Sequence, residues 1–147
     1  MKSLSIFLIF AFLLSCTTNV QEKKNPIEGT WELVSSKWSS PDTTSTFPDT
    51  DYYRMIKMIS RTHFVFVIQD TSVENSDGFG GGKYTLDGDK YTEHVEFLSD
   101  SELIGKSVTY TVKVEGDTLI QSGIYPAKKY GIGEYDWDFS EVYKRID

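Results

Sequence analysis

The chain has 147 residues, a formal net charge of −7, 14% aromatic residues and a single cysteine. This length suits one domain rather than two, and the acidic balance argues against binding to nucleic acid or to anionic lipid surfaces, because both repel negative charge. With one cysteine no intradomain disulfide can form, so the core must be held together by burial of apolar and aromatic side chains.

The first sixteen residues combine a positive start with a short apolar run. Lys2 precedes residues 4–14, which only Ser5 interrupts, and Ser15 and Cys16 close the run. A membrane-spanning helix needs ~20 apolar residues, so this shorter run is typical of a secretory signal peptide. The alternatives are an uncleaved membrane anchor, a free reactive thiol at Cys16 or an intermolecular disulfide through it.

This end of the chain resembles the lipobox of bacterial lipoproteins, in which the cysteine thiol receives a diacylglyceryl group before the signal is removed. The resemblance implies cleavage after residues 1–15, lipidation of Cys16 and acylation of the new N-terminal amine. Several acyl chains at ~0.8 kcal/mol per buried CH₂ hold a protein firmly in a bilayer. We therefore expect a lipoprotein of the bacterial cell envelope, anchored outward of the cytoplasmic membrane, with the outer membrane as the first expectation. Residues 16–26 are polar and predict a tether.

Residues 27–147 are expected to form one all-β domain. Residues 106–114 alternate strictly between apolar and polar side chains, which predicts a strand with one buried face. Asp87-Gly88-Asp89 and Glu115-Gly116-Asp117 predict tight hairpin turns. The eight predicted strands are 30–38, 52–60, 62–69, 83–86, 90–98, 106–114, 118–123 and 135–146. A sandwich or a single antiparallel up-and-down barrel accommodates this pattern, and the barrel is preferred because closure leaves no exposed strand edge.

The opening of the first predicted strand, Gly29-Thr30-Trp31, resembles the Gly-x-Trp motif of lipocalins. The segment Glu141-Val142-Tyr143-Lys144-Arg145 is similar to the last strand of lipocalin-like domains, where an arginine packs over that tryptophan. The resemblance covers residues 27–146 and extends to small secreted bacterial lipocalin-like proteins. It implies an eight-stranded barrel in which Gly29, Trp31 and Arg145 have a structural role in closing one end, with Arg145 stacked on Trp31. The Thr-Asp-Tyr signature of many lipocalins is missing, so no particular lipocalin's ligand is transferred.

A barrel of eight strands is either filled by side chains or holds one small ligand. Alternation places Glu93 and Glu141 on otherwise apolar inner faces, where a buried carboxylate needs a donor or a ligand. Together with the neighbouring inward residues they predict the polar lining of an apolar cup. The predicted lining residues are Tyr84, Glu93, Tyr110, Gln121, Trp137 and Glu141.

The strand register around Glu93 leaves alternatives open. The same alternation places Tyr91, Val95 and Phe97 on the inner face. Glu93 then either faces a ligand or pairs with Arg54 or Lys57 near the rim. A bulge or a slip by one residue instead turns His94 and Glu96 inward.

The remaining motifs are interpreted as structural. His94 and Glu96, even with His63 added, are a sparse ligand set, so no metal, haem or other cofactor is expected. The run Gly80-Gly81-Gly82 precedes a strand rather than a helix, which favours a flexible connection over a phosphate-binding loop. The longest predicted connections are 39–51 and 70–82, with Phe47 and Phe79 as their apolar tips.

Three functions fit these observations. The preferred one is a monomeric, lipid-anchored barrel that binds a small hydrophobic or amphipathic molecule. The first alternative is an interaction protein with a filled barrel. The second is a calycin-type isomerase or cyclase in which Glu93 or Glu141 acts as general base assisted by Tyr110. No Ser-His-Asp spacing or nucleophile elbow supports an enzyme, so no catalytic residue is predicted.

Overall fold

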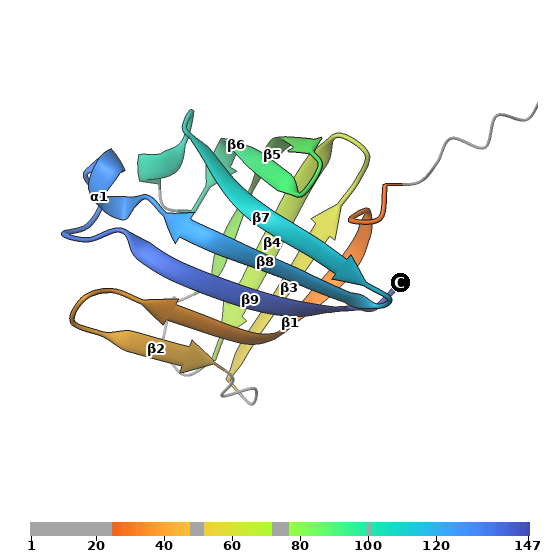
Figure 1. The fold of residues 1–147 in the computed structure, drawn as a ribbon, viewed down its shortest axis with the longest axis horizontal. Helices are drawn as coiled ribbons and strands as arrows, with labels where there is room; N and C mark the ends of the chain where they lie inside the picture. Colours follow the sequence, from red (N-terminus) through yellow and green to blue (C-terminus); the bar gives the residue numbers. More distant parts are fainter. Residues whose placement is uncertain (1–24, 48–51, 72–76, 100) are drawn as a thin grey trace, which may run out of the picture.

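The computed structural model describes residues 25–47, 52–71, 77–99 and 101–147. Within these ranges nine strands form one antiparallel sheet, and the pairing of β1 with β9 closes the sheet into a barrel (Figure 1). The strands are β1 (Gly29–Ser39), β2 (Thr44–Phe47), β3 (Tyr53–Ile59), β4 (His63–Asp70), β5 (Gly78–Asp87), β6 (Lys90–Leu98), β7 (Ser107–Glu115), β8 (Thr118–Tyr125) and β9 (Trp137–Arg145). A 3₁₀ turn, η1 (Ser101–Leu103), follows β6, and a single helical turn, α1 (Ala127–Tyr130), follows β8.

Eight of the described strands make up the barrel, and β2 is an addition to its wall. The first residues of β1 pair with β3, whereas its last residues pair with β2 and the whole of its length runs beside β9. A bulge at Val34 interrupts the pairing between β1 and β9, and bulges of this kind bend a strand and increase its twist. The predicted all-β, eight-stranded up-and-down barrel is therefore confirmed.

The two ends of the barrel differ. At one end the hairpins turn tightly, and Gly88 and Gly116 adopt the positive φ angles of 62° and 58° that such turns require. At the other end lie the longer connections, which include η1 and α1 (Figure 1). The densest part of the core fills the tight-turn end, which is called the closed end below. Its fully buried side chains include Ile27, Trp31, Phe64, Tyr91, Leu119 and Tyr143.

Arg145 covers the closed end from outside. Its guanidinium lies 4.0 Å from the centre of the Trp31 ring, within cation–π range. Arg145 Nη1 donates a hydrogen bond to the Glu28 carbonyl at 2.7 Å, and Nη2 donates one to the Pro26 carbonyl at 3.0 Å. Trp31 Nε1 donates to the Ile27 carbonyl at 2.8 Å. Arg145 of the last strand thus holds the segment that leads into the first strand against the closed end.

Both long connections predicted from the sequence contain strand structure. The strand β2 lies within residues 39–51, and β5 begins at Gly78 instead of residue 83. The run that begins at Gly80 is thus part of the barrel wall and not a flexible connection. A Cβ atom on Gly80 would come within 2.6 Å of the Phe66 ring and the Leu98 side chain. These two neighbours occupy the space that a side chain at Gly80 would need, which explains a glycine at this position of a strand.

A bulge in β6 overturns the predicted inward orientation of Phe97. Gly82 pairs with Val95 and Gly81 pairs with Phe97, so Glu96 is an extra residue in β6. Alternation holds as far as Val95 and then reverses, because an extra residue moves all that follow to the other face. Phe97 is 40% exposed on the outside, and Leu98 lines the interior instead. Glu93 precedes the bulge and is buried, as the original register required.

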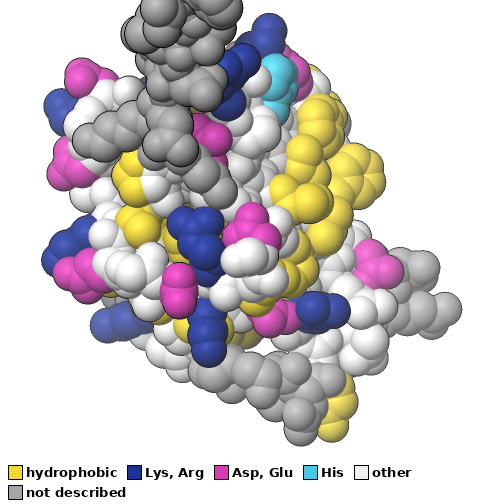
Figure 2. All heavy atoms as spheres, turned by 90° about the vertical axis from the view of Figure 1, so that its right-hand side faces the viewer, with side chains coloured by type: hydrophobic (Ala, Val, Ile, Leu, Met, Phe, Trp, Pro, Cys, Tyr) yellow, Lys and Arg dark blue, Asp and Glu magenta, His cyan; other side chains and the backbone are white. Residues whose placement is uncertain are grey.

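The outer surface carries charges of both signs. On the face of Figure 2, basic and acidic side chains are interspersed, whereas hydrophobic side chains gather along one edge. Val67, Phe79 and Phe97 are exposed on the neighbouring strands β4, β5 and β6. None of the helices in the described ranges is long and apolar enough to span a membrane.

Candidate ligand-binding site

The barrel interior contains a cavity of about 520 Å³ on the side of the long connections. Its wall is mostly aromatic and aliphatic and includes Trp38, Phe66, Ile68, Tyr125, Trp137 and Phe139. Small residues also line it, among them Ser36, Ser45 and Gly81, so the space is not filled by the wall itself. The volume lies within the range of about 300–1,000 Å³ that is usual for small-molecule sites.

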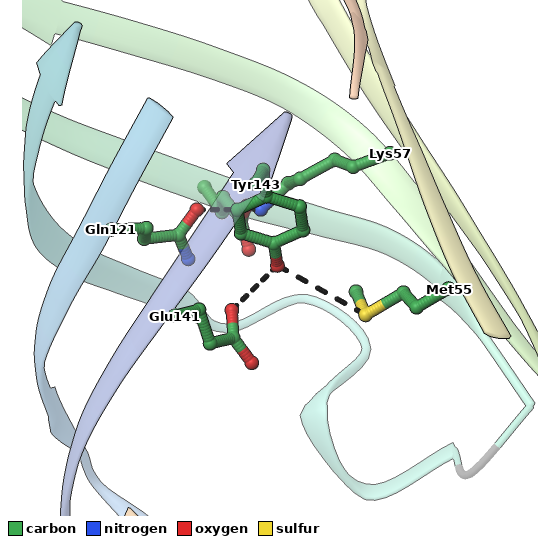
Figure 3. A network of polar contacts seen from close by, with 6 residues as sticks. Met55, Lys57, Gln121, Glu141 and Tyr143 are labelled. Atoms are coloured by element: carbon green, nitrogen blue, oxygen red, sulfur yellow. Dashed lines mark hydrogen bonds and ion pairs between the residues drawn. The ribbon is translucent and has the colours of Figure 1, made fainter. Parts of the chain in front are cut away.

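A buried ion pair lies where the cavity meets the closed end. Lys57 Nζ on β3 donates to Glu93 Oε1 on β6 at 2.6 Å. It also donates to Gln121 Oε1 on β8 at 2.8 Å (Figure 3). The side chains of Lys57 and Glu93 are only 2% and 9% exposed. Ions removed from water are tolerated only when they are paired and hydrogen-bonded, and this arrangement supplies both conditions.

Aromatic rings complete the surroundings of the Lys57 ammonium. Its Nζ lies 5.6 Å from the ring centre of Phe64, 5.4 Å from that of Tyr91 and 6.0 Å from that of Tyr143. The negative faces of such rings attract a cation. The lysine is therefore held from several strands at once, and its charge is already engaged within the protein.

Glu141 on β9 is the second carboxylate of the cavity. The Tyr143 hydroxyl donates to Glu141 Oε2 at 2.6 Å and also lies 4.0 Å from Met55 Sδ (Figure 3). Burial raises the pKa of Glu141, and the charge of Lys57 and the hydrogen bonds from Tyr143 and Trp38 only partly oppose this effect. Among the described residues, no basic side chain lies within ion-pair distance of Glu141.

Buried tyrosines and the half-buried Tyr53 surround these acids. Burial, together with the charges of Glu141 and Asp70, raises the pKa of Tyr53 to about 12. Burial and the nearby Glu93 carboxylate raise the pKa of Tyr110 and of Tyr91 well above the usual value. Within the described residues the buried Tyr91 hydroxyl has no hydrogen-bond partner. The raised pKa values extend the neutral form of these hydroxyls to more alkaline pH than in an exposed tyrosine.

A family model for a domain of unknown function, DUF4488, matches residues 26–147. The chain belongs to the DUF4488 family. Among solved structures, it is similar to an uncharacterized protein from Bacteroides eggerthii, with 12% sequence identity and a TM-score of 0.46 over 81% of this chain and 98% of that one. A comparison with curated proteins gives no match. The DUF4488 barrel is also consistent with the lipocalin-like architecture expected from the sequence.

Five of the six predicted lining residues meet around the cavity of this DUF4488 barrel: Glu93, Tyr110, Gln121, Trp137 and Glu141. Tyr84 does not line it, because its hydroxyl turns toward the tight turn after β3 and donates to the Ser60 carbonyl at 2.8 Å. Tyr84 is therefore removed from the candidate site. Whether the other five bind a ligand stays a prediction.

Lys57 lies deeper in the barrel than the sequence predicts. The sequence offers it as a partner for Glu93 near the rim, yet the ion pair is deeply buried. Alternation along β3 places Lys57 between the buried Met55 and Ile59. The alternation that predicts inward-facing glutamates on β6 and β9 therefore also predicts an inward-facing lysine on β3. Arg54, the other partner considered, pairs with Glu32 on the outside at 2.8 Å.

The other candidates from the sequence lie away from the cavity. His94 Nδ1 lies 2.8 Å from Ser107 Oγ, and His63 Nδ1 lies 2.7 Å from Thr62 Oγ1. In the part of the chain that the structure describes, no group of three or more histidine, cysteine and acidic residues is arranged to hold a metal ion. Cys16, the predicted signal peptide and most of the predicted tether lie outside the described residues.

Proposed function

We propose that this DUF4488 protein is a lipid-anchored protein of the bacterial envelope whose barrel binds a small hydrophobic or amphipathic molecule. The observation that carries the binding part of the proposal is the cavity of about 520 Å³ with an apolar wall. A filled barrel acting as an interaction protein has no need of such a space. The cavity therefore favours a ligand over a purely surface-borne function.

The distribution of polar groups favours an amphipathic ligand. Glu93, Gln121 and Glu141 lie deep in the barrel beside Lys57, whereas Phe66, Ile68 and Leu98 form an apolar wall. Sites for small molecules commonly combine an apolar lining with a few polar groups that fix the orientation of the ligand. A ligand with one polar end and one apolar end matches both parts of this cavity.

Binding can be tested by blocking the cavity from the short strand β2. Ser45 lines the cavity, whereas the adjacent Thr46 is exposed and does not. We expect Ser45→Phe to lower the affinity for a hydrophobic fluorescent probe at least about tenfold by filling the space, and Thr46→Phe to leave it unchanged. Equal affinities in both variants, or no binding of the probe to the wild-type domain, would contradict the proposal. Native mass spectrometry of the domain purified from its own host would then identify any bound molecule.

The anchor rests on the sequence of residues 1–16 and is tested separately. The wild-type protein is expected to incorporate labelled palmitate and to sediment with membranes, because several acyl chains provide far more hydrophobic contact than one. Cys16→Ser is expected to do neither. Membrane association that persists in Cys16→Ser without label would instead indicate an uncleaved N-terminal anchor.

A further inference from the structure

We propose that the cavity selects an amphipathic ligand whose head group is an organic cation, with Glu141 as its counterion and the aromatic cluster of Trp38, Tyr110, Tyr125 and Phe139 as its enclosure. This inference rests on the proposed binding function and adds the chemical class of the ligand. It follows from the charged side chains that line the cavity and from the position of the aromatic cluster beside Glu141.

The charges that line the cavity do not balance. In the described part of the chain these are Lys57, Glu93 and Glu141. Lys57 and Glu93 neutralise each other at 2.6 Å, and the lysine's further hydrogen bond goes to the neutral Gln121. Glu141 is hydrogen-bonded by neutral groups only, the Tyr143 hydroxyl at 2.6 Å and the Trp38 side chain. The buried site is therefore one positive charge short when both acids are ionised, and a ligand cation would supply it.

The side chains around Glu141 supply no second cation. Lys57 and Tyr53 face it from β3, Glu93 from β6, Tyr110 from β7 and Tyr143 from its own strand. The neutral Trp38 hydrogen-bonds it from β1, and the neutral Gln121 pairs with it from β8. The single cation in this set is already paired, and the other groups are neutral or acidic. Burial raises the pKa of Glu141, and Lys57 and the hydrogen bonds from Tyr143 and Trp38 oppose this rise.

The aromatic cluster lies directly beside Glu141 on the inner face. In the pairing of β1 with β9, Ser36 faces Glu141, and Trp38 faces Phe139 one step nearer the long connections. Trp38 stacks on Phe139 at 4.8 Å and meets Tyr125 edge-on at 5.5 Å, while Tyr110 meets Phe139 edge-on at 4.9 Å. Aromatic rings grouped in this way recognise ammonium groups through their negative faces.

The same arrangement disfavours an anionic head group. A carboxylate or phosphate placed near Glu141 would meet two acids, and the ammonium of Lys57 is already bonded to Glu93 and Gln121. An uncharged head group would avoid repulsion but would leave Glu141 without a counterion. The affinity should therefore be highest for a cationic head group, lower for an uncharged one and lowest for an anionic one.

The test uses probes that share one alkyl chain and differ in charge: dodecyltrimethylammonium, dodecanol and dodecanoate, all below their aggregation concentrations. The protein is the segment 25–147, which contains the complete barrel, its closed end and the whole cavity. Titration calorimetry, with the fluorescence of Trp38 and Trp137 as a second signal, is expected to give at least about tenfold tighter binding of the ammonium than of the alcohol. Dodecanoate is expected to bind most weakly.

Glu141→Gln isolates the carboxylate, because its amide oxygen can still accept the hydrogen bond from Tyr143. We expect this variant to lose the preference for dodecyltrimethylammonium and to keep its affinity for dodecanol. Glu115→Gln is the matched control: Glu115 is an exposed acid of β7 outside the cavity, so this change should alter neither affinity. A second variant, Phe139→Leu, removes one face of the enclosure and should weaken binding of the ammonium more than that of the alcohol.

The pH dependence gives an independent signature, because the quaternary ammonium itself does not titrate. Ionised Glu141 binds the cation and protonated Glu141 does not. The affinity for dodecyltrimethylammonium is therefore expected to rise with pH through the raised pKa of Glu141 and to level off above it. In Glu141→Gln the affinity should not change over this range.

The outcomes separate the head-group inference from the function on which it rests. If no probe of any charge binds, the proposed ligand-binding function itself fails. If all three bind equally, if dodecanoate binds best, or if Glu141→Gln keeps the preference for the ammonium, the head-group inference is overturned and binding stands. Near-UV circular dichroism of each variant establishes that the barrel has folded before its affinities are compared.

Discussion

Lys57 is a cavity residue on which the stability of the folded protein is expected to depend. Its ammonium pairs with one of the two acids of the site, Glu93, and is buried among aromatic rings. A charge in this position is costly when isolated and acceptable when paired. Lys57 therefore stabilises the fold as well as lining the site, and we expect its replacement to lower the stability of the protein.

Lys57→Met is expected to lower the free energy of unfolding by about 3–5 kcal/mol, because it leaves Glu93 buried without a counterion. The double variant Lys57→Met/Glu93→Leu removes both charges and should recover most of that loss. Urea unfolding followed by circular dichroism measures both changes. If the double variant is as unstable as the single one, the loss comes from packing of the lysine stem rather than from the unpaired carboxylate.

The buried tyrosines and the half-buried Tyr53 are expected to make stability fall at alkaline pH. The pKa of Tyr53 is about 12 in the folded protein and about 10 in an unfolded chain, so between these values the native state binds more protons than the unfolded state. Its contribution is fully present below pH 10 and is lost as the pH rises toward 12. Urea midpoints measured from pH 9 to 12 should fall, and the fall should be shallower in Tyr53→Phe. An unchanged slope in that variant would assign the effect to the other buried tyrosines.

At the scale of whole strands, alternation predicted the barrel well, and it failed where local geometry departs from the regular pattern. Residues 106–114 and 118–123 correspond closely to β7 and β8, because every second side chain faces the core. Alternation does not locate the start of β5, since glycines carry no side chain from which a face can be inferred. It also does not decide whether β6 contains a bulge, because only the pairing with β5 reveals Glu96 as the extra residue.

Gly82 is the point at which β5 and the bulge in β6 depend on each other. A Cβ atom at Gly82 would collide with the carbonyl oxygen of His94 and crowd the Glu96 amide. Both are backbone atoms of the bulge and cannot move aside as a flexible side chain does. The close approach of the two strands therefore requires glycine.

Gly82→Ala is expected to cost about 3 kcal/mol of stability, at the upper end of the usual range for overpacking. Gly78→Ala in the same strand is the control, because the nearest atom to its Cβ would lie at 3.4 Å, an ordinary contact. Thermal and urea unfolding of both variants provide the comparison. Similar losses at the two positions would show that the effect comes from glycine's strand preference in general rather than from the bulge.

On the scale of the whole molecule, the cavity is the feature that sequence reasoning could anticipate only in outline. Alternation identified inward-facing residues one strand at a time, and five of the six predicted lining residues surround one space. The volume of that space depends on how side chains from opposite strands meet, and no local pattern contains this information. The partnership of Lys57 with Glu93 is of the same kind, because it joins residues that are far apart in the sequence.

The closed end holds the two termini of the domain together, and this organisation leads to a last prediction. Arg145 bonds the carbonyls of Pro26 and Glu28 and covers Trp31. Arg145→Ala removes two charge-assisted hydrogen bonds and one cation–π contact, which should lower stability by about 2–4 kcal/mol. Arg145→Lys should retain only part of this stability, because an ammonium group cannot make both hydrogen bonds and stack on Trp31 at the same time.

The control for this prediction is Arg54→Ala, which breaks the ion pair with Glu32 on the outer surface. Exposed pairs of this kind contribute about 1 kcal/mol or less. A stability loss in Arg145→Ala that exceeds the loss in Arg54→Ala therefore measures what Arg145 contributes beyond an exposed ion pair. Hydrogen exchange adds the location of the effect: in Arg145→Ala the amides of β1 and β9 should exchange faster than those of β6 and β7. Uniform acceleration across all strands would mean that Arg145 stabilises the barrel as one cooperative unit, and not by closing this end alone.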